Sequence, residues 1–286
     1  MSKVAVVTDS TASIPAARLK GLPIKVAPLQ VIWDNQTYLD SIDITPEQFY
    51  TRLQSSATMP TTSQTTPGTF QEIYKSLLDE GYDVISIHIS SKLSGTMDSA
   101  IQAKAAINSD RIELVDSETI GMSLGFTALN VAKAAVQGAN LAECKALAEK
   151  AKGHVGVYFL VNTLEFLHRG GRIGGAAAFL GTVLNLKPIL TVTDGRIEAV
   201  ERVRTMSKAI DRLLDLVEAD VSKLHTPIRL STLHANCQKE ADELLARARQ
   251  RFGVSEVDDT VVTDVSPVIG THTGPGALGF AYMAGL

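Results

Sequence analysis

The first half of the chain alternates short apolar runs with segments of helical periodicity, and this alternation limits the folds that it can adopt. Strands are predicted at 4–7, 25–33, 84–89 and 112–115, and helices near 46–54, 68–79, 97–108, 121–137 and 141–151. Thr45–Pro46 and Thr66–Pro67 mark helix starts, because a hydroxyl caps the first turn and proline is tolerated there. The pattern predicts a layered α/β/α domain with a mainly parallel sheet.

The pattern changes after Gly153. An apolar run at 155–161 is followed by strand-like segments at 188–192 and 196–203, joined by Asp194–Gly195, a strong hairpin signal. Helices near 206–221 and 237–252 then alternate with strands near 228–234 and 260–265. We therefore expect an α+β domain with a mainly antiparallel sheet, and two domains at 1–154 and 155–286, as a chain of 286 residues also favours.

Composition narrows the classes of function. A net charge of −4 argues against general attraction to nucleic-acid phosphates, so small molecules or proteins are the expected partners. Cys144 and Cys237 are far apart and indicate neither a disulfide framework nor a thiolate metal site. No signal peptide and no apolar span of ~18 residues is evident, which predicts a soluble, cytoplasmic protein without a transmembrane segment.

Three clusters of hydroxyl residues stand out. They are Thr61–Thr66 and Ser90–Thr96, each before a predicted helix, and Thr271–His272–Thr273 in a glycine-rich segment that we expect to be a loop between strands at 268–269 and 277–283. Hydroxyls and free amides at a helix start can bind an anion, although simple capping is the alternative for each cluster alone. Together they predict one shared carboxylate pocket, since such donors offset the desolvation of a carboxylate.

Two formal motif matches fit their usual roles poorly. Gly274–Gly279 satisfies the dinucleotide fingerprint but is not followed by the helix, strand and acidic residue that the motif requires. Gly121–Gly125 resembles a nucleophile elbow around Ser123, but polar residues separate it from the preceding strand, so a hydrolase is poorly supported. The sequence contains no phosphate-loop motif and no H-E-x-x-H pair, and we expect no ATP or metal site of its own.

The segment from Glu165 to Arg212 is basic. It holds eight basic and five acidic residues, a net charge of +3, which leaves −7 for the rest of the chain. Such a segment is either an ordinary solvated surface or a docking face for a phosphate-carrying or acidic partner.

Seven short motifs, taken together and in this order, resemble the DegV family from end to end. They are Val7–Thr11, Thr62–Gln64, Leu93–Thr96, Gly170–Gly174, Leu184–Leu190, Arg202–Thr205 and Gly270–Gly276. The sequence departs from the usual family pattern at Ser41, where glycine is common, and at Gly175, where a basic residue is common.

The resemblance implies a two-domain DegV-like (EDD) fold that binds a long-chain fatty acid in a tunnel between the domains. The protein would be the acyl-carrying subunit of a bacterial fatty acid kinase, with no cofactor of its own, and a separate subunit would supply ATP and metal. By similarity Thr62 and Ser94 bind the carboxylate, and Ser63, Gly95, Thr96, His272 and Thr273 complete or orient that network, His272 in an orienting catalytic role. Arg172, Arg202 and Arg204 would face the kinase.

Other functions stay open at this point: a stand-alone lipid carrier or sensor, and a small-substrate phosphotransferase or hydrolase. The small residues at 174–181, with Phe179, Leu180, Val183 and Leu184, fit either a channel wall or close helix packing. Burial of about fifteen methylenes at ~0.8 kcal/mol each would contribute about 12 kcal/mol before the entropy of binding is subtracted. Such a lipid would co-purify with the protein.

Overall fold

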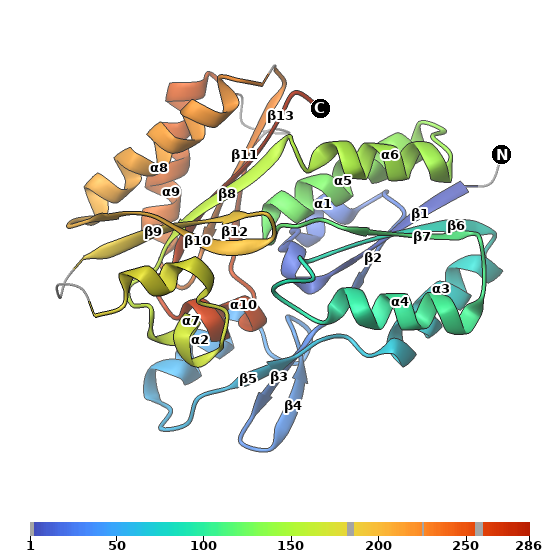
Figure 1. Ribbon diagram of the computed structural model, residues 1–286, viewed down its shortest axis with the longest axis horizontal. Helices are drawn as coiled ribbons and strands as arrows, with labels where there is room; N and C mark the ends of the chain where they lie inside the picture. Colours follow the sequence, from blue (N-terminus) through green and yellow to red (C-terminus); the bar gives the residue numbers. More distant parts are fainter. Residues whose placement is uncertain (1–2, 182–185, 225, 255–259) are drawn as a thin grey trace.

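A computed structural model describes residues 3–181, 186–224, 226–254 and 260–286 (Figure 1). Four strands of the first half form a parallel sheet in the order β2 (Ile24–Ala27), β1 (Lys3–Asp9), β6 (Tyr82–His88) and β7 (Ile112–Asp116). Helices α3 (Pro67–Asp79) and α4 (Thr96–Ile107) cover one face, and α5 (Met122–Val136) and α6 (Leu141–Ala151) cover the other. The predicted α/β/α layering with a parallel sheet is confirmed.

A small second sheet was not predicted. It consists of β4 (Gln36–Leu39), β3 (Gln30–Trp33) and β5 (Thr61–Ser63), all antiparallel, with α2 (Pro46–Ser55) between β4 and β5 in the chain. The single strand expected at 25–33 is wrong, because the chain leaves the parallel sheet after Ala27 and joins the small sheet at Gln30. Pro28 lies at the break and cannot donate a ladder hydrogen bond.

The second half forms a six-stranded sheet. Its order is β10 (Arg196–Val203), β9 (Lys187–Thr193), β8 (Val155–Leu160), β13 (Leu278–Ala284), β11 (Ile228–His234) and β12 (Thr260–Asp264). Only the β11–β12 pair among these is parallel, so the predicted mainly antiparallel sheet and the Asp194–Gly195 hairpin are confirmed. Helices α8 (Met206–Val221) and α9 (Gln238–Phe252) pack on its outer face.

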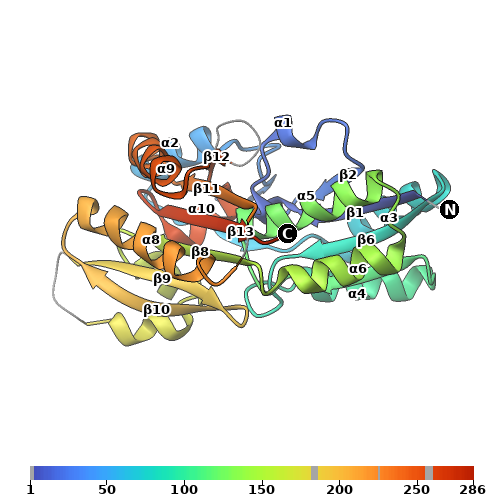
Figure 2. The ribbon, with the colours of Figure 1, turned by 90° about the horizontal axis from the view of Figure 1, so that it is seen from above.

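Helix α5 lies at the seam between the two large sheets (Figures 1 and 2). It contacts β1 on one side and β8 and β13 on the other. Gly125 permits close packing of α5 against the short 3-10 helix η1 (Ser10–Ala12) that follows β1, because a Cβ there would lie 2.6 Å from the carbonyl oxygen of Ala12. One buried cluster consequently includes residues of both halves, among them Ile87 and Ala281.

The other described elements are short: η1 (Ser10–Ala12), α1 (Ala16–Leu19), α7 (Glu165–Arg169), η2 (Gly174–Phe179) and α10 (Pro267–Thr273). Both departures from the family pattern have structural counterparts. Ser41 has φ of 61°, a conformation that glycine adopts more easily, and a Cβ on Gly175 would lie 1.8 Å from the Glu198 carboxylate. Val183, Leu184 and Asn185, expected in a channel wall or a family motif, lie outside the described residues.

Candidate functional site

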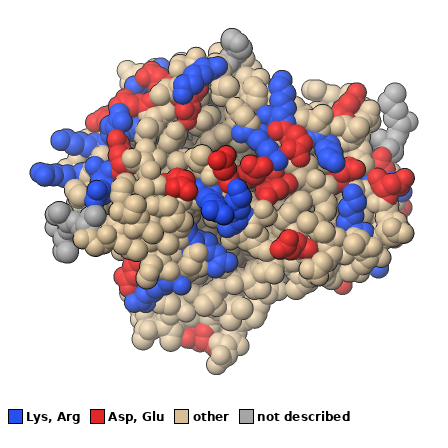
Figure 3. Space-filling view, viewed as in Figure 1, with Lys and Arg blue, Asp and Glu red and all other residues tan. Residues whose placement is uncertain are grey.

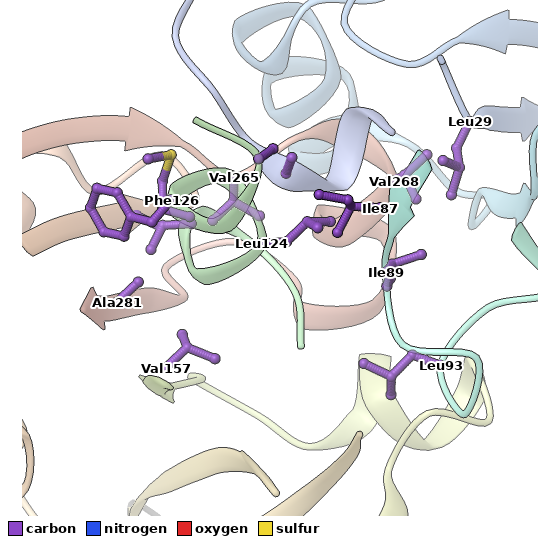
Figure 4. Close-up of a cluster of buried hydrophobic side chains, with 14 of the residues drawn as sticks. Leu29, Ile87, Ile89, Leu93, Leu124, Phe126, Val157, Val265, Val268 and Ala281 are labelled. Atoms are coloured by element: carbon purple, nitrogen blue, oxygen red, sulfur yellow. The ribbon is translucent and has the colours of Figure 1, made fainter. Parts of the chain in front are cut away.

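An apolar pocket lies at the seam between the two large sheets. The space between its walls, open mouth included, is about 970 Å³. Val157, Phe159 and Leu233 line it from the six-stranded sheet, and Ile89 and Leu93 from the opposite side. Figure 4 shows Leu93 and Ile89 on one side of this apolar cluster, away from Val157, Phe126 and Ala281.

The small-residue stretch at 174–181 does not line this pocket in the described part of the chain. Gly174–Phe179 forms the 3-10 helix η2, and Phe179, Leu180 and Gly181 line a separate groove. For this stretch a channel wall and close helix packing were both open, and its described part does not form the wall of this pocket. The wall comes from other segments, among them β5, β8, α10 and the loop at 89–94.

His272 is on a helix, and the expected strand at 268–269 is wrong. The Ser266 hydroxyl accepts a hydrogen bond from the Ile269 amide, and Pro267 occupies the first helical position, so α10 begins where a strand was predicted. This Ser–Pro pair is the same signal that correctly marked α2 and α3. The glycine-rich turn begins only at Gly274, where φ is +73° and a Cβ would lie 2.4 Å from the Phe166 ring.

Helix α10 is held by residues from the first half. Asp40 Oδ1 accepts a hydrogen bond from the Val268 amide at 3.1 Å, and the Tyr50 hydroxyl donates to the Val265 carbonyl at 3.0 Å. Gly270 lies against α2, because a Cβ there would be 2.5 Å from the Tyr50 hydroxyl oxygen. These contacts bring His272 to the small sheet.

The His272 imidazole joins two of the predicted clusters. Its Nε2 lies 2.8 Å from Thr62 Oγ1, and its buried Nδ1 has no hydrogen-bond partner among the described residues. Gly170 closes over that side, since a Cβ there would lie 2.1 Å from Nδ1. Burial lowers the pKa of His272 to about 4, and the positive charge of Arg172 acts in the same direction, so the ring is neutral near pH 7.

The Ser94 cluster meets the Thr62 cluster at Gly95. A Cβ on Gly95 would lie 3.0 Å from Gln64 Nε2, so the Gln64 side chain packs over this glycine. Ser94 Oγ lies 2.9 Å from Thr96 Oγ1 and accepts from the Thr96 amide at 3.3 Å. Thr96 is fully buried beside the pocket and supports Ser94 from behind.

Arg172 connects these clusters through backbone oxygens. Its Nε donates to the Leu93 carbonyl at 3.2 Å and its NH1 donates to the Gly170 carbonyl at 2.6 Å. Through these contacts and their chain neighbours, one group of residues surrounds this part of the pocket, and we call it the polar ring: Thr62, Gln64, Ser94, Gly170, Arg172 and His272. The predicted Thr62, Ser63, Ser94, His272, Thr273 and Arg172 all line the pocket, whereas Gly95 and Thr96 lie behind Ser94.

Arg202 and Arg204 lie elsewhere. They line a second, more polar groove with Lys187, His168 and Glu165, and the Arg202 guanidinium stacks over the Phe179 ring with 4.6 Å to its centroid. On the face seen in Figure 3, basic side chains lie among acidic ones and do not form one continuous patch. The three arginines predicted to face a partner are therefore divided between the pocket and this groove.

Sequence reasoning missed Gln64, Gly170 and Asp40 as parts of the site. Gln64 and Gly170 lie inside two of the seven family motifs, and this position marks them as candidate site residues. Asp40 carries no local pattern, because its role depends on α10, which follows more than two hundred residues later in the chain.

Two other features bear on chemistry. Ser123, the residue of the elbow-like motif, is fully buried and donates its hydroxyl to the Gly156 carbonyl at 2.7 Å, so it is not presented to a substrate. Within the described residues, no group of three or more His, Cys, Asp or Glu is placed to hold a metal ion. None of the helices there has both the length and the apolar character needed to cross a membrane.

Comparison with known proteins identifies the family. The model of the family described as "Uncharacterised protein, DegV family" matches residues 3–285. A DegV domain-containing protein of Streptomyces coelicolor is 39% identical over 277 residues, covering 96% of each chain. A fatty acid-binding DegV family protein of Thermus thermophilus superimposes with a TM-score of 0.91 at 37% identity, covering 99% of each chain.

Bacillus subtilis DegV, whose crystal structure is described as that of a fatty acid binding protein, superimposes with a TM-score of 0.87 at 36% identity. The superposition covers 99% of this chain and all of that one. The family match over almost the whole chain and these relatives agree with the seven sequence motifs. This chain belongs to the DegV family.

Proposed function

We propose that this protein binds a long-chain fatty acid in the apolar pocket and presents its carboxylate to a separate ATP-dependent kinase subunit for acyl-phosphate formation. The observation that carries the proposal is the ring of hydroxyl, amide and imidazole groups in the wall of an otherwise apolar pocket. The fatty acid binding of the Thermus and Bacillus relatives supports the choice of ligand.

The hydroxyls of Thr62 and Ser94 bind the carboxylate in this proposal. Each hydroxyl has one proton to donate and can accept from its neighbours. If His272 Nε2–H donates to Thr62 Oγ1, the Thr62 proton is free to point at the ligand, and the Thr96 hydroxyl releases the Ser94 proton in the same way. Ser63 and Thr273 complete the polar wall, and Gly95 and Thr96 shape the loop behind it.

His272 acts as a neutral orienting group. It keeps Thr62 and the carboxylate in place while the partner brings ATP and its metal, so the chain contributes mainly by positioning a substrate oxygen. The absence of a Cβ on Gly170 leaves room for the ring in this orientation.

The domain division and the partner surface belong to the same proposal. Residues 1–154 and 155–286 would form two domains with the ligand between them, as each large sheet takes its strands from one side of this boundary. Arg202 and Arg204 in the second groove, with Arg172 at the pocket, would contact the kinase subunit in the cytoplasm.

Native mass spectrometry of the purified protein, followed by solvent extraction, tests the ligand. We expect a bound fatty acid whose occupancy falls in Ser94→Ala and is unchanged in Ser91→Ala, an exposed serine of the same loop. ATP and fatty acid should give no acyl phosphate until the partner subunit is added. Acyl-phosphate formation without the partner subunit would favour a stand-alone enzyme. No acyl-phosphate formation even with the partner subunit would favour a carrier or sensor.

A further inference from the structure

Leu233 occupies an unusual position in the wall of the apolar pocket. Its side chain lies between two glycines: a Cβ on Gly121 would be 3.0 Å from Leu233 Cδ2, and a Cβ on Gly279 would be 3.4 Å from Cδ1. All three residues line the pocket, and Leu233 is 4% exposed. Because Gly121 and Gly279 have no side chains, the two methyl groups of Leu233 occupy the space beside them.

The sheet register explains this arrangement. Gly279 pairs with Leu233 on β11 and with Phe159 on β8, so the three residues form one row across the sheet with no side chain at its centre. On the face of β13 that includes Gly279, the residues before Met283 are small: Ala277 just before the strand, Gly279 and Ala281. Leu278 and Phe280 face the cluster under α8 and α9. A shallow trough therefore runs along β13.

The trough leads away from the polar ring. Figure 4 places Ala281 and Val157, the next row after Gly279 on the same face of the sheet, on the far side of the cluster from Leu93, the neighbour of Ser94. Val157 still lines the pocket but Ala281 does not, so the cavity ends near this row. Leu233 stands one row before that end.

We propose that Leu233 sets the length of the acyl chain that the pocket accepts. This inference rests on the proposed function, because it assumes that the carboxylate lies at the polar ring and the tail along β13. Since both neighbours lack a Cβ, the size of the side chain at 233 decides how much of the trough is open. Each methylene that gains or loses a buried place changes affinity by about fourfold.

The experiment compares variants at 233 across a series of saturated fatty acids that differ by two methylenes. Leu233→Ala should shift the preferred ligand to a chain longer by about two methylenes, and Leu233→Phe to a shorter one. Leu233→Val, a milder change, should move the preference in the direction of Leu233→Ala and guards against loss of folding. Displacement titration gives the affinities, and extraction gives the chain lengths retained from cells.

Leu230→Ala is the matched control. Leu230 is fully buried on the same strand but belongs to the cluster beneath α8 and α9, so this variant should lower stability and leave the chain-length preference unchanged. An unchanged preference in both Leu233→Ala and Leu233→Val, with wild-type protein still binding fatty acid, overturns the inference alone. If the wild-type protein binds no fatty acid, the proposed function itself fails.

Discussion

Thr62 Oγ1 and His272 Nε2 lie 2.8 Å apart although 210 residues separate them in the chain. Thr62 is on β5 of the small sheet and His272 is near the end of α10, so this contact joins segments from both halves at the pocket. Because the imidazole is neutral near pH 7, the pair offers hydrogen bonds to an anion without a fixed positive charge between them.

Replacing Thr62 with valine removes the hydroxyl and keeps the shape of the side chain. We expect fatty acid affinity to fall about tenfold or more, because a hydrogen bond to a charged group contributes ~1.5–3 kcal/mol. The methyl ester of the same fatty acid should be affected much less, since it carries no charge. Thr61→Val, an exposed neighbour on β5, is the control for both ligands. Equal losses for acid and ester would contradict the role of Thr62.

A methyl group at Gly170 should displace the His272 ring, because the added Cβ would lie 2.1 Å from Nδ1. We expect Gly170→Ala, like His272→Ala, to lower the rate of acyl-phosphate formation about tenfold or more while lipid retention falls less, since orienting groups act mainly on the reaction. Gly153→Ala is the control, as its Cβ would meet nothing closer than 3.9 Å. The ratio of the initial rate to retained lipid is the measurement; parallel losses would argue against an orienting histidine.

Local signals predicted much of this fold. Thr45–Pro46, Thr66–Pro67 and Asp194–Gly195 each fixed an element boundary through chemistry contained within a few residues. The same kind of signal at Ser266–Pro267 was outweighed by the apolar Val268–Ile269 pair, which suits a strand or a buried helix equally well. The pairing of β3 with β5 could not be predicted from local sequence patterns, because the paired residues are more than twenty positions apart in the chain.

The site was predictable to a similar extent. Hydroxyl clusters and family motifs indicated Thr62, Ser94 and His272, and the structure brings them to one pocket. The walls of that pocket were not predictable from the small-residue stretch, because the space depends on which face of β13 packs inward. The alternation of small and large residues along β13 identifies the inward face only when the order of the strands in the sheet is known.

Asp40 should make stability depend on pH. Burial raises the pKa of its carboxyl group to about 6 from 3.8, so the folded protein holds this proton more tightly than the unfolded chain does. The stabilisation is complete below pH 3.8 and is lost as the pH rises through 6. Asp40→Asn keeps an acceptor for the Val268 amide but cannot titrate, so the wild type should lose about 3 kcal/mol relative to this variant between about pH 4 and pH 7.

Urea unfolding of both proteins across this range measures the difference. The buried His272 acts in the opposite direction, because its lowered pKa removes stability as the pH falls from 6.5 toward 4. That contribution is present in both proteins and cancels in the comparison. A constant difference between wild type and Asp40→Asn would show that Asp40 is not protonated in this range.

The two arginine environments should separate lipid binding from partner binding. Arg172 holds the carbonyls of Leu93 and Gly170, so Arg172→Glu should weaken fatty acid affinity about tenfold as well as slow acyl-phosphate formation. Arg202 stacks on Phe179 in the second groove, so Arg202→Glu should leave fatty acid affinity unchanged and raise the kinase concentration needed for half-maximal rate. That rise should shrink at high salt, because exposed charges are screened.

Arg172→Gln should raise the pKa of His272 toward its ordinary value, because the positive charge beside the ring is removed. A pH titration of the imidazole signals by NMR measures this pKa. If Arg172→Glu changes only the dependence of the rate on kinase concentration, Arg172 contacts the partner alone and does not support the pocket.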